Sequence, residues 1–188
     1  MSKRGTGLVR VGLDSLYLAC GWLAGMFLVV ILGLMMALSL GRQFGLNVPS
    51  GDDFAAWSMA ALAFLSLAYT FRSGELIRIG LVLDRLDGWT RHAVEVGCLL
   101  LGAALVGFFA WHAVRMNYDS WRFDDISQGV VAVPLWFPQL GYSVGLVVLS
   151  VAFVDELVHV LRGHLPRYEK PKPKTAEEVI ERAIESGI

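Results

Sequence analysis

Apolar residues gather in four long runs along the chain, and shorter stretches that carry most of the charged residues separate them. The runs cover about residues 15–40, 54–71, 93–114 and 139–161. A helix needs about 20 apolar residues to cross the hydrocarbon core of a bilayer. The pattern therefore predicts an all-α integral membrane protein, with four transmembrane helices in a membrane domain over residues 1–165. The first run is too long for the apolar part of a signal peptide, about 7–15 residues, so we expect it to remain as a helix.

Residues 71–86, between the second and third runs, are too charged for a bilayer core and too apolar for an ordinary loop. Arg78 and Arg85 are seven positions apart, so a helix would place both on one side, opposite a wide apolar face. We therefore predict an amphipathic helix over about residues 75–87, lying in the membrane interface with its arginines toward phosphate groups. Gly74 would permit the sharp turn out of the second span.

The positive charges are distributed unevenly among the segments that join the runs. All 16 Lys and Arg residues except Arg42, Arg115 and Arg122 lie in the N-terminal tail, between the second and third runs, or in the C-terminal tail. Lys and Arg are enriched on the cytoplasmic side of membrane proteins. We therefore predict that both termini and the segment between the second and third spans are cytoplasmic. The formal net charge of -1 indicates no nucleic-acid partner.

Residues 166–188 are predicted to form a polar cytoplasmic tail. Pro166, Pro171 and Pro173 alternate with basic residues and indicate a flexible linker. The residues from Thr175 to Glu178 have the pattern of a capping box, which predicts a short helix after the linker. The weakly apolar face of that helix is compatible with docking on a partner and with an ordinary surface helix.

Charged residues deep in a membrane span are candidates for function because their burial is costly. The predicted spans carry their charged and histidine residues only near their ends, so we expect no complete ion or proton pathway. His92 and His159 lie at helix ends and His112 has no partner at its level, which argues against a heme. The sequence lacks protease, hydrolase and phosphate-loop motifs, so we predict no enzyme, cofactor or metal. Cys20 and Cys98 lie inside apolar runs and are expected to be buried, unreactive thiols.

Two of the spans contain a Gly-x-x-x-Gly pattern, one at Gly21 and Gly25 and the other at Gly141 and Gly145. Such a pattern lets two membrane helices approach closely. Glycine is common in membrane helices, so the sequence is equally compatible with a packing seam and with loosely placed glycines.

Two local motifs resemble the small membrane subunit of tripartite ATP-independent periplasmic (TRAP) transporters, the DctQ-like family. The first follows Trp57 and reads Ala68-Tyr69-Thr70-Phe71-Arg72-Ser73-Gly74-Glu75-Leu76-Ile77-Arg78-Ile79, which is similar to the family's Arg-x-Gly-x-His-Ile-x-Val. The second reads Ser127-Gln128-Gly129 and then Pro134-Leu135-Trp136-Phe137-Pro138, which is similar to its Ser-x-Gly and Pro-x-Trp-x-Pro. Leu76 and Gly80 stand where the family often has His and Asp. The resemblance covers nearly the whole chain in layout.

The resemblance implies a non-catalytic scaffold subunit in the bacterial inner membrane. In such systems a large elevator-type permease subunit carries the substrate and coupling-sodium sites, and a periplasmic substrate-binding protein captures an organic acid for uptake by sodium symport. The small subunit packs beside the large one and contacts membrane lipids. The residues that we expect at subunit or lipid contacts are Trp57, Arg72, Gly74, Glu75, Arg78, Arg85, Trp136 and Pro138.

Two other functions remain compatible with the sequence. One is a membrane anchor of a redox complex with a heme or quinone site. The other is a free-standing four-helix membrane protein that binds a soluble partner through its C-terminal helix.

Overall fold

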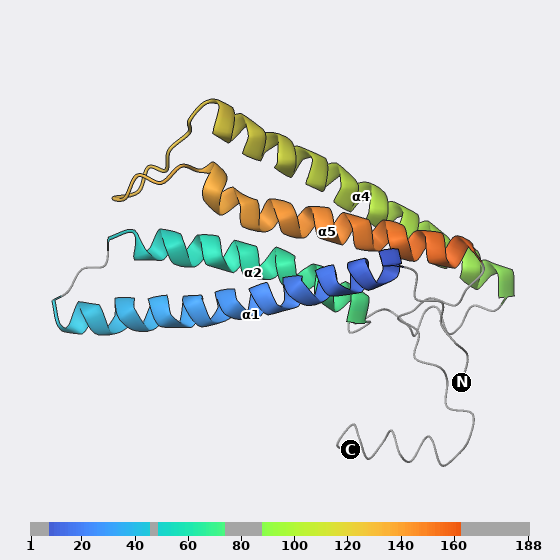
Figure 1. Cartoon of the computed structure of the whole chain (residues 1–188), viewed down its shortest axis with the longest axis horizontal. Helices are drawn as coiled ribbons and strands as arrows, with labels where there is room; N and C mark the ends of the chain where they lie inside the picture. The colour runs from blue at the N-terminus through green and yellow to red at the C-terminus, as the bar shows by residue number, and fades with distance from the viewer. Residues whose placement is uncertain (1–7, 46–48, 74–87, 163–188) are drawn as a thin grey trace, which may run out of the picture.

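The computed structural model describes residues 8–45, 49–73 and 88–162. They form four long helices, α1 (Leu8–Gln43), α2 (Gly51–Ser73), α4 (Gly88–Arg122) and α5 (Trp136–Leu161) (Figure 1). Each is long and apolar enough to cross a membrane, which confirms the predicted all-α fold with four candidate spans. The amphipathic helix expected at about 75–87 and the short helix after Thr175 lie outside the described residues.

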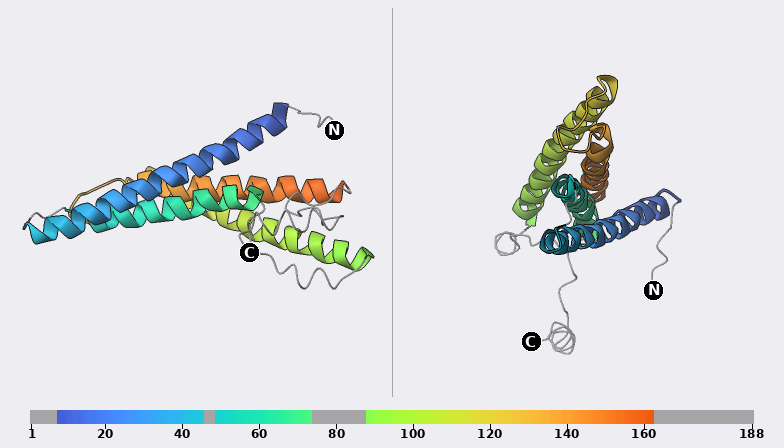
Figure 2. Two further views of the ribbon diagram at one scale, coloured as in Figure 1. Left: turned by 90° about the horizontal axis from the view of Figure 1, so that it is seen from below. Right: turned by 90° about the vertical axis from the view of Figure 1, so that its left-hand side faces the viewer.

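The helices pack as an open row in the order α1, α2, α5, α4. Helix α2 contacts both α1 and α5, and α5 contacts both α2 and α4. Figure 1 shows the row from the side and the right view of Figure 2 shows the helices nearly end-on, with α1 and α4 on the two sides and α2 and α5 between them. Each outer helix therefore has one covered face, whereas each central helix is covered on two.

The row has two ends that the loops define. One holds Asp14 near the start of α1, together with the last turns of α2 and α5, and we call it the Asp14 end. The other holds the loop of residues 123–135 between α4 and α5, and we call it the hairpin end (Figure 1). Helices α2 and α5 run in the same direction between these ends, and α1 and α4 run in the opposite direction.

Small residues bring α2 and α5 close together. A Cβ atom added to Gly141 would lie 2.5 Å from the Cβ of Ala61, and one added to Gly145 would lie 2.6 Å from the backbone carbonyl carbon of Phe64. Glycine removes the side chains that would hold the two backbones apart. The pattern at Gly141 and Gly145 is therefore a packing seam.

The other glycine pattern is used only in part. A Cβ atom on Gly21 would lie 3.0 Å from the ring of Tyr69 on α2, so Gly21 lies in the contact between α1 and α2. A Cβ atom on Gly25 would meet no described atom within 4 Å. Gly25 therefore faces open space beside the contact.

The cysteines differ in burial. Cys20 is buried in the core cluster with Tyr17 and Ala24, as expected. Cys98 is exposed, so the expectation of a buried thiol is wrong for this residue. The cause is the position of α4 at the side of the row, where α5 covers only one of its faces and Cys98 lies on another.

Candidate interaction sites at the two ends of the row

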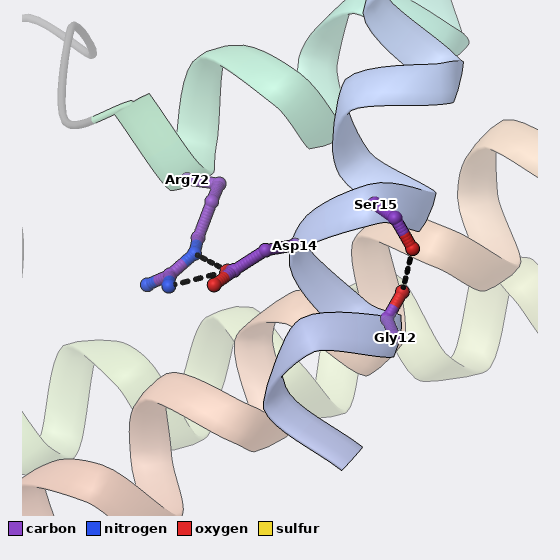
Figure 3. Close-up of polar contacts among 4 residues, drawn as sticks. All are labelled: Gly12, Asp14, Ser15 and Arg72. Carbon is purple, nitrogen blue, oxygen red and sulfur yellow. Dashed lines mark hydrogen bonds and ion pairs between the residues drawn. The ribbon is translucent and has the colours of Figure 1, made fainter. Parts of the chain in front are cut away.

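An ion pair joins α1 and α2 at the Asp14 end. Both Nε and Nη2 of Arg72, in the last turn of α2, donate hydrogen bonds to Oδ1 of Asp14, at 3.2 and 2.7 Å (Figure 3). A cation in the last turn also interacts favourably with the helix dipole. The sequence predicted Arg72 as a contact residue but gave no role to Asp14. The sequence did contain a signal for this pair, because Asp14 and Arg72 flank the first two predicted spans on the same expected side of the membrane.

The polar groups at this end are not all at the surface. Glu95 of α4 and Glu156 of α5 are among the charged residues near the ends of the spans, and both side chains are buried. Each lies on the same helix face as other core residues, Glu95 one turn from Leu99 and Glu156 one turn from Ala152. A buried carboxylate requires polar partners, so these residues fix the packing at this end more strictly than solvated charges would.

A short hairpin forms the loop at the opposite end. Ile126 and Pro134 make an antiparallel bridge, and the backbone N–H of Ser127 donates to the carbonyl of Val133 at 2.8 Å. The Ser127 hydroxyl donates to the carbonyl of Val131 at 3.1 Å and accepts the N–H of Val133 at 3.4 Å. Ser127 therefore closes the hairpin with both its backbone and its side chain.

The hairpin is docked on the start of α2. The N–H of Val131 donates to Oγ of Ser50 at 2.9 Å. A Cβ atom on Gly129 would lie 2.5 Å from Oδ2 of Asp53 and 3.1 Å from Oγ of Ser50. Only glycine permits this approach without a shift of Asp53. Ser127 and Gly129, which the sequence singled out as a motif, thus build the hairpin and its contact with α2.

The second half of that motif starts α5. Pro138 lies in the first turn of the helix, where its missing N–H costs no hydrogen bond. The carbonyl of Trp136 accepts a hydrogen bond from Nδ2 of Asn117 at 3.1 Å, which ties the start of α5 to α4. Trp57 of α2 packs edge to face against Phe54, with 5.2 Å between the ring centroids.

The remaining predicted contact residues, Gly74, Glu75, Arg78 and Arg85, lie outside the described residues. Of the predicted set, the structure thus describes Trp57, Arg72, Trp136 and Pro138. It does not bring them together, because Arg72 is at the Asp14 end and Trp136 and Pro138 follow the hairpin.

His112 is exposed on α4, and its Nδ1 lies 2.9 Å from the carbonyl of Phe108 in the preceding turn. Because a carbonyl only accepts hydrogen bonds, Nδ1 is the donor in this pair. Within residues 8–45, 49–73 and 88–162, no three His, Cys, Asp or Glu side chains are grouped in a way that could hold a metal ion.

Comparison with known families identifies this arrangement. The model of the DctQ component of tripartite ATP-independent periplasmic transporters matches residues 31–163. The chain belongs to the DctQ family. This range includes all of α2, α4 and α5 and both motifs described above. No individually curated protein matches the chain.

Membership in the DctQ family makes the chain the small permease component of a TRAP transporter and a multi-pass membrane protein. The family is a transporter component and not an enzyme family, and it does not favour the alternative of a redox-complex anchor.

Proposed function

We propose that this DctQ chain is the static scaffold of a sodium-coupled transporter that takes up an organic acid across the bacterial inner membrane. Its partners are a large elevator-type permease subunit, which holds the substrate and sodium sites, and a periplasmic substrate-binding protein. Both termini and residues 74–87 lie in the cytoplasm, and the hairpin end faces the periplasm. Family membership carries this proposal.

The distribution of charge supports a scaffold rather than a transport pathway. No charged residue lies between Asp14 and Arg42 on α1, or between Asp53 and Arg72 on α2. On α5, the first charged residue is Asp155. Substrate or ion pathways through a membrane use polar groups at mid-depth. The transport sites therefore belong on another subunit.

The contacts between helices support a rigid role. The Asp14–Arg72 pair joins α1 to α2 at one end, and the Ser50–Val131 hydrogen bond joins α2 to the α4–α5 loop at the other. Between them, glycines at 141 and 145 lock α2 against α5. The ion pair, the hydrogen bond and the close glycine packing oppose sliding between the helices. An elevator-type subunit needs such a stationary partner.

The open sides of the row provide surfaces for the large subunit. Helices α1 and α4 each expose large apolar side chains, for example Val29 and Leu32 on α1 and Leu101 and Phe108 on α4. Helix faces that expose several large apolar side chains lie against lipid or against other membrane helices. The row therefore extends the membrane-embedded surface of whatever subunit it joins.

Reconstitution into vesicles tests the proposal. We expect sodium-driven uptake of an organic acid when this chain, the large subunit and the binding protein are present together, and none when this chain is reconstituted alone. Transport by the lone chain would contradict the proposal.

The arginines of the 74–87 segment provide a second test. We expect Arg78→Glu combined with Arg85→Glu to lower the yield of the complex and its transport rate, because these residues are proposed to contact phosphate groups or the large subunit. Unchanged yield and transport would remove that role and leave the scaffold proposal in place.

A further inference from the structure

A groove of about 830 Å³ runs between α1 and α2 on the surface of the described helices. Its walls include Leu18, Gly25 and Leu28 of α1 and Leu62, Ser66 and Tyr69 of α2. The Ser66 hydroxyl donates to the carbonyl of Ala63 at 3.0 Å, so it is already satisfied within α2. The groove is thus almost wholly apolar, which suits a hydrocarbon ligand and not a polar solute.

The ion pair lies in line with this groove. Asp14 precedes Leu18 by four residues, and Arg72 follows Tyr69 by three, so each shares a helix face with a residue of the groove wall. An apolar groove that is continued by a pair of charges has the polarity profile of a bilayer at the boundary between acyl chains and headgroups.

Arg72 has the capacity to bind a second anionic group. A guanidinium carries five N–H donors. The pair with Asp14 uses Nε and one N–H of Nη2, and both donate to the same carboxylate oxygen. The side chain of Arg72 is 23% exposed. Among the described residues the other donors have no hydrogen-bond partner, so they can reach the oxygens of a phosphate, which is a preferred partner of arginine.

The groove is long enough to hold part of an acyl chain. It follows α1 from Leu18 to Val29, which is about 16 Å at the rise of an α-helix. Its apolar walls would lie along the acyl chain, and the Asp14–Arg72 pair beyond one end would lie at the depth of a lipid headgroup.

We propose that this groove binds a phospholipid of the leaflet at the Asp14 end, with its acyl chains along α1 and α2 and its phosphate at Arg72. In the proposed orientation this is the cytoplasmic leaflet. The site would make one lipid a fixed part of the α1–α2 pair. The proposal does not rest on the transport function, because it follows from the groove and the ion pair.

Two glycines of α1 provide a matched pair of variants. A Cβ atom at Gly25 or at Gly33 would meet no described atom within 4 Å, so both positions are open where a side chain would begin. Gly25 lines the groove, and Gly33 is not among its lining residues. Gly25→Leu therefore fills the groove, and Gly33→Leu controls for the added bulk and helix propensity.

Native mass spectrometry of the full-length chain, purified in its complex and delipidated, measures binding of added phosphatidylethanolamine or phosphatidylglycerol. We expect Gly33→Leu to bind as the unmodified chain does and Gly25→Leu to lose the tightly bound lipid. Equal binding by the two variants overturns the proposal. Loss of the large subunit rather than of lipid from Gly25→Leu also overturns it, because a protein helix would then occupy the groove.

The headgroup contact has its own test. Arg72→Gln should weaken phospholipid binding by about tenfold, since a charge-assisted contact to phosphate is lost. Asp14→Asn should leave binding equal or tighter, because the competing carboxylate charge is removed. Diacylglycerol, which has no phosphate, should bind the unmodified chain no better than phospholipid binds Arg72→Gln. If Asp14→Asn weakens binding as much as Arg72→Gln, the pair is only structural and the headgroup assignment is wrong.

Discussion

At the scale of single residues, the role of a glycine in this protein depends on what lies beside it. Gly145 faces the backbone of Phe64, where a Cβ atom would be only 2.6 Å from the carbonyl carbon. Gly33 faces open space on α1. The two residues are indistinguishable in a sequence that is rich in membrane glycines, because the neighbour that separates them is far away in the chain.

We expect Gly145→Ala to destabilise the protein by about 1–3 kcal/mol, because backbone atoms of α2 cannot move aside for the new methyl group. Gly33→Ala is the control, and it should be neutral or slightly stabilising because alanine favours a helix over glycine. Thermal unfolding in detergent measures both. Equal unfolding temperatures for the two variants would contradict the packing seam.

The Asp14–Arg72 pair is a connection of modest strength. Asp14 is 52% exposed, so solvent screens the attraction. We expect a double-mutant cycle with Asp14→Asn and Arg72→Gln to give a coupling energy below about 1 kcal/mol. Denaturant unfolding in detergent at low and high salt measures it, and the coupling should shrink at high salt. A coupling of several kcal/mol would show that the pair is effectively buried.

At the scale of elements, the hairpin of residues 123–135 joins the α4–α5 pair to the start of α2, which is distant in the chain. Its N–H at Val131 bonds to Ser50, which precedes α2, and its glycine packs beside Asp53. The tip residue Val130 is 83% exposed. The element is therefore anchored on one side and open on the other.

We expect Gly129→Val to detach the hairpin from α2 while the helices remain folded. Hydrogen exchange reports this directly, because the Val131 amide loses its acceptor and should exchange faster. Ser50→Ala should have the same effect on that amide. Gln128→Ala, an exposed position in the same loop, is the control. Unchanged exchange at Val131 in both test variants would contradict the docked hairpin.

The residues of the second motif show which features of the hairpin can be predicted from the sequence. The sequence showed Ser127, Gly129, Trp136 and Pro138 as parts of one motif. It did not locate the acceptor of the Val131 amide. That acceptor, Ser50, lies 81 positions away, and only the packing of α2 beside the hairpin brings it close.

At the scale of the whole molecule, the open row has consequences for orientation and assembly. The charge distribution predicts the Asp14 end in the cytoplasm and the hairpin end in the periplasm. The structure separates these ends by the length of the helices, so labelling from one side of the membrane distinguishes them (Figure 1).

We expect a membrane-impermeant thiol reagent to label Val130→Cys in intact cells, and to label Lys172→Cys only after the membrane is opened. Both changes are made in a chain with Cys20→Ala and Cys98→Ala, so that no natural thiol reacts. The positive-inside rule is the physical reason for the expected asymmetry. The reverse labelling pattern would contradict the orientation.

The sequence by itself determined the class of the protein, its four spans and its family. Local sequence patterns determine these properties, since the length of an apolar run sets whether a helix can cross a bilayer. The two motifs likewise stand as short stretches of adjacent residues, and the family match to residues 31–163 contains both.

Only the tertiary structure decided which residues meet. It paired Asp14 with Arg72, buried Glu95 and Glu156, exposed Cys98 and made a seam of Gly141 and Gly145 but not of Gly25. The order of helices in the row sets all of these outcomes. In a bilayer an apolar side chain has a similar free energy against lipid and against protein. Hydrophobicity along the chain therefore does not encode which face of a helix is covered.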